Sequence, residues 1–433
     1  MNMTINKLNY RKKSGEGMIE TRKLDCGTRI VMEQIPYVQS VAIGIWVKTG
    51  AVDEIKNISG ISHFIEHMMF KGTEKRSAKK IAEDVDRIGG QINAFTGREA
   101  TCYYMKTLNS NAEQAAEILL DMFLNSTFDK TEMSREKQVI YEEMKMIEDT
   151  PDDYAHEEIS DLIFKGCPYE KSIIGTQSSL KSISQATLKK YIEDEYTRDS
   201  LVISIVGNVD MDSLCRIFDG KLSQLKAEKL AKKFYNEEYE PHFKVKVKDI
   251  EQSHLCMGTR GISLEDDRYY ALSLLNNIMG GSMSSRLFQN IREQKGLAYS
   301  VYSHASSFAN AGYYNIYAGV SHDKISDAIH GIKEELESLK KDGITEDELH
   351  VAKEQLKASY IFGQENVNGR MFSNGKNTIL LNRIYTPEEV IGEIDAVTME
   401  DIQKASALID DIEQYSAVIV TNKKCDLKKI VRS

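Results

Sequence analysis

Two stretches of sequence decide the fold: INAFTGREATCYYMKTL at residues 92–108 and LAYSVYSHASSFANAGYYNIYAGV at residues 297–320. Each stretch predicts two β-strands joined by a turn that contains glycine, because residues of high strand propensity stand on both sides of the glycine. A further strand pattern precedes each pair, VAIGIWV at residues 41–47 and SHLCMGTRG at residues 253–261. Helical patterns lie between this strand and the pair in both halves. The same order of elements therefore occurs twice.

The spacing of matching residues supports an internal repeat. Gly90 matches Gly296 at an offset of 206 residues. The late strands LVISIVGNV, from Leu201, and SAVIVTN, from Ser416, follow in the same order at a similar offset. We therefore predict two homologous domains of about 210 residues each.

Composition predicts where the two domains join. The stretch AEKLAKKFYNEEYEPHFKVKVKD is dense in charge and is typical of a linker, because it cannot supply a core. We predict an N-terminal domain at residues 1–221, a charged linker at 222–244 and a homologous C-terminal domain at 245–433. Each half runs strands, helices, strands, helices and a last strand. The predicted fold class is therefore α+β, with a mostly antiparallel sheet covered by helices on one face of each domain.

Composition also excludes several classes of protein. With 433 residues, of which 41% are hydrophobic and 28% charged, the chain is a folded globular protein. Its formal net charge of -10 argues against a nucleic-acid partner. No stretch approaches the roughly 18 apolar residues of a membrane span, and the start lacks the apolar middle of a secretory signal. We expect a cytoplasmic protein without a membrane partner.

The motif that carries chemistry is SGISHFIEHMMFKG at residues 59–72. Ser59 is the predicted N-cap of a helix of about three turns. His63 and His67 are four residues apart and project from one face, which Glu66 shares. The pattern H-x-x-E-H is the inverzincin signature. Two neutral imidazoles and a carboxylate can hold zinc and leave one position for water, whose proton a second carboxylate then takes.

A third ligand is expected on a long helix predicted between Asp129 and Pro151. Glu136 and Glu143 are seven residues apart, so they lie on one face of this helix. Glu142 points about 100° away from them. Spacing therefore favours Glu136 or Glu143 as the ligand and does not choose between them.

Together these residues resemble the pitrilysin and insulinase metallopeptidases, especially the short-chain group of mitochondrial processing peptidase subunits and their bacterial relatives. The resemblance covers nearly the whole chain and rests on ISHFIEHMMFKGT, REKQVIYEEMKMIEDTPDD, INAFTGREATCYY and GGSMSSRLFQNIREQKGLAYSVYS. The family's third ligand lies 76 residues after the second His, which implies Glu143 as ligand and Glu136 as a supporting carboxylate. Glu66 would be the general base that activates water and passes its proton to the leaving amine.

The resemblance implies further site residues. Arg292 and Tyr299 match a pair seven residues apart in the family. Tyr299 would donate a hydrogen bond to the oxyanion or the scissile carbonyl, and Arg292 would help to position the substrate. An extended peptide adds to an edge strand in the family, and the matching residues here are Asn93, Ala94, Phe95 and Thr96.

The second half keeps no His where the repeat expects the motif, because the sequence there is DDRYYALSLLNNIMGG. One zinc ion per chain follows. Family members enclose a chamber with four such domains, so a chain with two domains implies a homodimer. We expect composite sites, with zinc held by one subunit and Arg292 and Tyr299 supplied by the other.

The predicted function is that of a zinc endopeptidase that cleaves peptides or unfolded segments inside the chamber. The alternative is a noncatalytic scaffold subunit of the same fold, although relatives of that kind have usually lost zinc-site residues. The segment from Glu142 to Asp161 contains nine acidic residues and one lysine. It would favour basic peptides if it lines the chamber, and it is otherwise a solvated helix face.

Overall fold

The computed structural model describes residues 10–14, 17–230 and 238–433. The chain forms two compact units. The first contains the described residues of 1–143, 171–233 and 361–390, and the second contains those of 144–170, 234–360 and 391–433. Each unit therefore includes a segment from the opposite half of the sequence.

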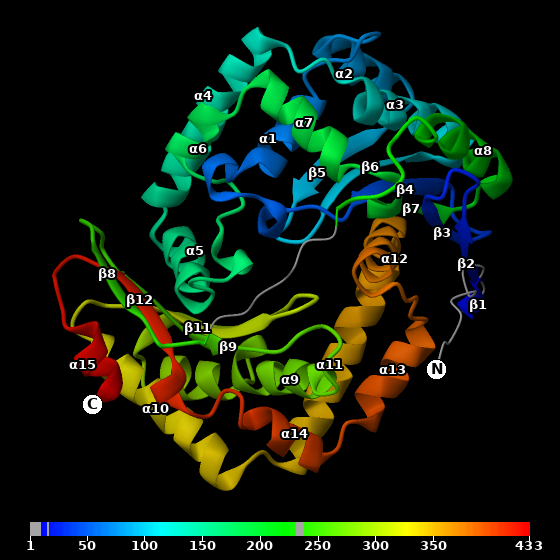
Figure 1. Cartoon of the computed structure of the whole chain (residues 1–433). Coiled ribbons are helices and arrows are strands. Elements are labelled where there is room, and N and C mark those ends of the chain that lie inside the picture. Colours follow the sequence, from blue (N-terminus) through cyan, green and yellow to red (C-terminus); the bar gives the residue numbers. More distant parts are fainter. Residues whose placement is uncertain (1–9, 15–16, 231–237) are drawn as a thin grey trace. The chain divides into compact units, whose positions relative to one another are not determined.

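The first unit is built on a seven-stranded sheet, whose strands are β1 (Tyr10–Ser14), β2 (Gly17–Lys23), β3 (Arg29–Gln34), β4 (Ser40–Val47), β5 (Gln91–Thr96), β6 (Thr101–Leu108) and β7 (Leu201–Gly207). Their order is β1-β2-β3-β7-β4-β6-β5 (Figure 1). Among these strands only the pair β3 and β7 is parallel. The predicted α+β class with mostly antiparallel sheets is therefore confirmed, and β5 is an edge strand.

Helices cover both faces of this sheet. The helices that begin in the first unit are α1 (Ile61–Met69), α2 (Ala78–Arg87), α3 (Ala112–Asn125), α4 (Lys130–Asp149), α6 (Gln177–Ser182), α7 (Gln185–Glu195), α8 (Met211–Leu222), α12 (Val367–Leu381) and α13 (Pro387–Ala396). Tyr103 of β6 packs against Phe123 of α3, whereas the next residue, Tyr104, packs against Phe372 of α12. Successive strand residues point to opposite faces. The expectation of helices on one face was therefore wrong, because α12 comes from far along the chain.

The second unit is built on a five-stranded sheet, whose strands are β8 (Phe243–Val247), β9 (Ser253–Arg260), β10 (Ala298–Ser307), β11 (Gly312–Val320) and β12 (Ser416–Thr421). Their order is β10-β11-β9-β12-β8, so β10 is an edge strand. Only β8 and β12 are parallel among these strands. The helices that begin in this unit are α5 (Pro151–Ile163), α9 (Tyr269–Asn276), α10 (Ile325–Asp342), α11 (Glu346–Gln364), α14 (Met399–Ser406) and α15 (Leu427–Arg432).

The two halves of the chain exchange one helix each. Helix α12 packs on β4 and β7 in the first unit, and α5 packs on β9 and β12 in the second. A glycine lies at each crossing, where a Cβ at Gly44 would be 2.4 Å from Met371 Sδ and a Cβ at Gly258 would be 2.8 Å from Ile163 Cδ1. Glycine permits this close approach because it has no side chain. The compact units are therefore interleaved in sequence.

The predicted linker at 222–244 is described only in part. Residues 231–237 lie outside the described residues, and Phe243 already belongs to β8. Of the described helices, none combines the length and the apolar character needed to cross a bilayer.

Candidate metal centre

Helix α1 presents His63, Glu66 and His67 on one face and packs its apolar residues inward. Phe64, Ile65 and Met68 are fully buried in the core of the first unit. This burial fixes the rotation of the helix, because the apolar stripe must face the core. The three polar residues of the motif are consequently only partly buried.

The start of α1 differs from the prediction that Ser59 caps it. The N-cap is Gly60, whose φ of 86° lies in the left-handed region and which has no side chain to cap the helix. The buried carboxylate of Glu54 takes this role by accepting hydrogen bonds from the N–H groups of Gly60 at 2.6 Å and Ser62 at 2.9 Å. Burial raises the pKa of Glu54 to about 7. Glu54 was not predicted as a cap, because it lies outside the N-cap and N3 spacing of a local capping pattern.

The structure brings His63, His67 and Glu143 together. One ligand atom from each of the three lies within 4.8 Å of the others. The Nε2 atom of His67 is 3.6 Å from Glu143 Oε1, and the Nε2 atom of His63 is 4.0 Å from Glu143 Oε2. Helix α4 delivers Glu143 from 76 residues further along the chain. The Nε2 atoms of both imidazoles thus lie near the same carboxylate.

Glu136 lies on the other side of His67. Its Oε2 atom is 3.2 Å from His67 Nδ1, and its Oε1 atom is 2.7 Å from the ammonium nitrogen of Lys71. Glu136 is only 5% exposed, so Lys71 compensates a buried negative charge. An Nδ1–H that donates to Glu136 leaves the Nε2 lone pair of His67 available on the side of Glu143. Lys71, in the FKG end of the motif, was not predicted as a site residue.

The donor set fits a zinc ion. One atom of this set, Glu143 Oε2, is buried and has no hydrogen-bond partner among the described residues. Burial, together with the neighbouring His67, lowers the pKa of His63 to about 4, so this imidazole is neutral at physiological pH. Zinc binds neutral imidazole nitrogens together with a carboxylate oxygen. Calcium and magnesium ions prefer ligand sets made of oxygen atoms, so this set suits zinc better.

Glu66 lies next to the edge strand β5. The hydroxyl of Thr96 donates a hydrogen bond to Glu66 Oε2 at 2.6 Å. Burial raises the pKa of Glu66, which makes its carboxylate a stronger base. Phe95 points to the opposite face, where its ring centroid is 5.5 Å from that of Trp46. Of the four predicted edge-strand residues, Asn93, Ala94, Phe95 and Thr96, the last contacts Glu66 through its side chain.

Arg292 and Tyr299 both belong to the second unit. Arg292 lies in the π-helical segment Phe288–Gln294, and Tyr299 lies on the edge strand β10 with 75% of its surface exposed. The guanidinium of Arg292 is 5.7 Å from the ring centroid of Tyr299. The two residues are thus adjacent, and the tyrosine ring is open to a ligand.

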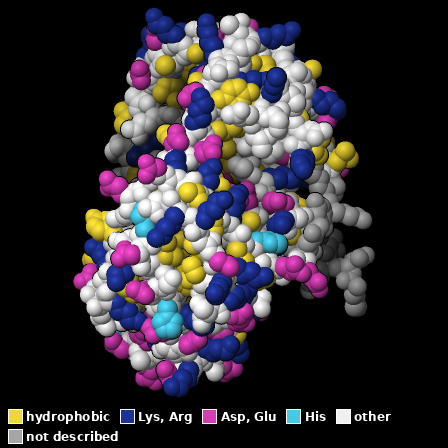
Figure 2. All heavy atoms as spheres, turned by 90° about the vertical axis from the view of Figure 1, so that its left-hand side faces the viewer, with side chains coloured by type: hydrophobic (Ala, Val, Ile, Leu, Met, Phe, Trp, Pro, Cys, Tyr) yellow, Lys and Arg dark blue, Asp and Glu magenta, His cyan; other side chains and the backbone are white. Residues whose placement is uncertain are grey.

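The acidic segment at residues 142–161 is partly neutralised. Lysines of β8 and the residue after it pair with its carboxylates at 2.5 to 3.0 Å, in the pairs Lys244–Glu158, Lys246–Glu148 and Lys248–Asp149. Figure 2 shows acidic and basic side chains interspersed on the face that it presents. These three carboxylates therefore contribute little net field.

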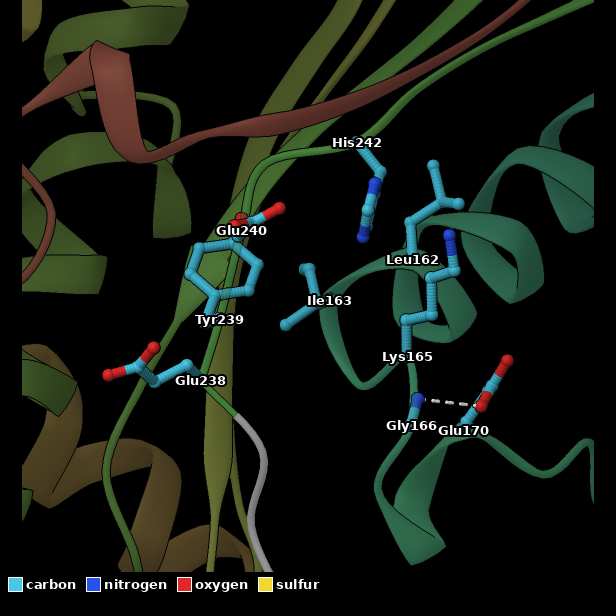
Figure 3. A pocket seen from close by; sticks show the side chains of 9 residues that line it. All are labelled: Leu162, Ile163, Lys165, Gly166, Glu170, Glu238, Tyr239, Glu240 and His242. Carbon is cyan, nitrogen blue, oxygen red and sulfur yellow. Dashed lines mark hydrogen bonds between the residues drawn. The ribbon is translucent and has the colours of Figure 1, made fainter.

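A separate cavity of about 500 Å³ lies in the second unit, where α5 ends. Ile163, Tyr239 and His242 lie around it, and Glu170 accepts a hydrogen bond from the N–H of Gly166 at 2.8 Å (Figure 3). Within the described part of the chain, only His63, His67 and Glu143 form a group of three metal-ligating side chains. Among the described residues, no such group lines this cavity.

Comparisons with known families and proteins agree with this geometry. Residues 29–177 match the family described as Insulinase (Peptidase family M16), and residues 182–356 match the one described as Peptidase M16 inactive domain. The uncharacterized zinc protease YmxG of Bacillus subtilis is 45% identical over 385 residues, which cover 89% of this chain and 94% of that protein. The uncharacterized zinc protease SCO5738 of Streptomyces coelicolor is 33% identical over 397 residues, which cover 90% of this chain and 86% of that protein.

Two solved structures share the fold. A peptidase M16 inactive domain from Pseudomonas fluorescens has a TM-score of 0.87 at 19% identity, covering 94% of this chain and 98% of that one. A protease from Helicobacter pylori has a TM-score of 0.86 at 22% identity, and the match covers 93% of this chain and 99% of that one.

Proposed function

Because this chain belongs to the insulinase family of peptidases, peptidase family M16, we propose that it is a zinc-dependent endopeptidase. Its substrates are peptides or unfolded segments. The proposal rests on the meeting of His63, His67 and Glu143 from two helices, with Glu66 on the same helix face as the two histidines. A metallopeptidase needs these two parts, a metal site and a nearby base, in one place.

Each residue of the centre has a distinct role. His63, His67 and Glu143 would hold the zinc ion, which when bound lowers the pKa of water and polarises a carbonyl. Glu66 accepts a proton from the attacking water and delivers it to the leaving amine. Glu136 orients His67 by accepting the hydrogen bond of its Nδ1–H.

The substrate binds by adding a strand to β5. An edge strand offers main-chain N–H and C=O groups that pair with any extended peptide, so the sequence requirements are broad. The acidic segment at 142–161 keeps a surplus of negative charge after three of its carboxylates pair with lysines. Basic peptides are therefore included among the proposed substrates.

The proposed assembly is a homodimer with two composite sites. One subunit supplies the zinc centre, and the other supplies Arg292 and Tyr299. A Glu66→Gln chain and a Tyr299→Phe chain, each inactive alone, should regain part of the activity when they form a heterodimer, because one of the two sites is then intact. No recovery in a verified heterodimer would exclude composite sites.

The proposed activity is tested by metal analysis combined with a quenched-peptide assay. We expect about one zinc ion per chain, and cleavage that a chelator abolishes and added zinc restores. A protein that binds no zinc and shows no chelator-sensitive cleavage would contradict the proposal. It would instead favour a noncatalytic scaffold subunit of the same fold.

A further inference from the structure

We propose that Thr96 is a positioning residue for Glu66, so that the strand that receives the peptide also orients the general base. The inference rests on the proposed function, in which β5 binds the substrate and Glu66 moves the proton. The Thr96 side chain then serves the base, whereas the sequence predicted Thr96 only as a substrate contact.

The geometry of the contact supports this assignment. Thr96 Oγ1 and Glu66 Oε2 are 2.6 Å apart, which is the distance of a strong hydrogen bond between a hydroxyl and a carboxylate. The hydroxyl must be the donor, because an ionised carboxylate only accepts. The bond engages Oε2, and Oε1 is the other proton-accepting oxygen of the same carboxylate.

The backbone around Thr96 is held in place on both sides. Thr96 pairs with Thr101 of β6, and the turn that follows is closed by a hydrogen bond from Gly97 N–H to the carbonyl of Ala100 at 2.8 Å. The turn also packs closely on Gly50, where a Cβ would lie 2.4 Å from the carbonyl oxygen of Gly97. Threonine itself has few χ1 rotamers, because it is branched at Cβ. The hydroxyl therefore has a fixed position from which to hold a side chain.

Strand alternation separates this role from substrate recognition. Neighbouring residues of β5 point to opposite faces, so Thr96 points to the face of α1 while Phe95 packs against Trp46. A peptide that adds to β5 bonds to its main chain. It would thereby pair with the same strand whose last side chain aligns Glu66. Peptide binding and base alignment are thus linked through one residue.

Two conservative variants test the inference. Thr96→Val keeps the shape of the side chain and removes the donor, whereas Thr96→Ser keeps the donor. We expect Thr96→Val to lower kcat by at least about tenfold with little change in KM, because it removes alignment rather than binding. Thr96→Ser should restore most of the activity. Thr107→Val is a control in the same hairpin, because the hydroxyl of Thr107 donates only to the carbonyl of Ile88, at 2.7 Å.

The pattern of kinetic constants decides between explanations. A rise in KM at constant kcat would overturn the inference, since it would make Thr96 a substrate contact. Equal losses in Thr96→Val and Thr96→Ser would also overturn it. So would an equal loss of kcat in Thr107→Val, because the effect would then come from the hairpin as a whole.

A second measurement does not depend on activity. In a crystal structure of metal-free Thr96→Val, the Glu66 carboxylate should leave its position beside residue 96, while His63, His67 and Glu143 stay together. An unmoved Glu66 would overturn the inference. If the wild-type protein cleaved no peptide, the proposed function would fail, yet this structural comparison would still decide whether Thr96 orients Glu66.

Discussion

The edge of the first sheet and the edge of the second sheet are built alike and differ in chemistry. Strand β5 and strand β10 each lie at one edge of their sheet, and each follows helical segments of the repeat. Beside β5, helix α1 carries His63, Glu66 and His67. In the second unit, the helix at the matching place is α9, whose sequence YYALSLLN contains no histidine or carboxylate.

The comparison shows that the scaffold does not determine the chemistry. Both helices bury an apolar stripe, with Ala271, Leu272, Leu274 and Leu275 buried in α9. The second unit instead places Arg292 and Tyr299 at its edge strand. One fold therefore carries a candidate metal centre in one copy and the side chains of an arginine and a tyrosine in the other, and only a few side chains distinguish them.

The largest effect is expected from Glu66→Gln. This variant tests whether peptide cleavage depends on a side chain of α1 and not on one of α9. The amide cannot take a proton from water, so kcat/KM should fall about 10²- to 10⁴-fold while zinc binding stays unchanged. The matched control in α9 is Ser273→Ala, since the Ser273 hydroxyl donates only to the carbonyl of Tyr269. A quenched-peptide assay measures both. Comparable losses in the two variants would contradict the contrast between the helices.

The starts of the two helices differ as well, and Glu54→Gln tests this difference. Glu54 caps α1, whereas α9 begins at Arg268 without a side-chain cap. Because burial raises the pKa of Glu54 from 4.5 to about 7, the folded state binds this proton more tightly than the unfolded state. The resulting stabilisation is complete below pH 4.5 and is lost as the pH rises to 7.

The free energy of unfolding of Glu54→Gln, relative to wild type, should therefore rise by about 3 kcal/mol between pH 4.5 and pH 7. Urea unfolding of the metal-free proteins at several pH values measures it. If the difference in the free energy of unfolding between Glu54→Gln and wild type stayed constant with pH, Glu54 would not titrate in this range.

The exchanged helix α12 is tested by Gly375→Ala. A Cβ at Gly375 would lie 2.1 Å from the indole nitrogen of Trp46, and this rigid ring cannot move away cheaply. We expect a loss of about 2 kcal/mol in the free energy of unfolding. The control is Gly392→Ala in α13, where a Cβ would meet nothing within 4 Å and should stabilise the helix slightly. Thermal unfolding distinguishes the two variants, and equal melting temperatures would refute the close packing of α12.

The smallest effect is expected from Lys71→Met, which removes the cation that compensates Glu136. Without this cation, the position of the buried Glu136 carboxylate is less restricted. Because Glu136 orients His67, the orientation of the imidazole is less restricted as well. Zinc affinity, measured by competition with a chromophoric chelator, should weaken about tenfold. Lys75→Met, four residues along the chain, is a control that should leave the affinity unchanged. An unchanged affinity in Lys71→Met would show that Lys71 does not support the centre.

Helical periodicity was enough to place His63, Glu66 and His67 on one face, because their side chains lie within one turn of each other. The same reasoning failed for Ser59, since the N-terminus of α1 is capped by a carboxylate that lies nearby only after the chain has folded back. Helical periodicity also could not decide whether Glu136 or Glu143 is the third metal ligand. Both share one face of α4, and only their different contacts with His67 separate them.

The amino-acid sequence by itself determined the local features of this protein: the repeated order of strands and helices and the spacing of the motif. These follow from side-chain periodicity and turn propensity, which act over a few residues. The tertiary structure alone decided the exchange of α5 and α12, the cap from Glu54, the pairing of Lys71 with Glu136 and the contact of Thr96 with Glu66. Such contacts depend on how the folded backbone brings side chains together, and no periodic pattern in the sequence encodes that meeting.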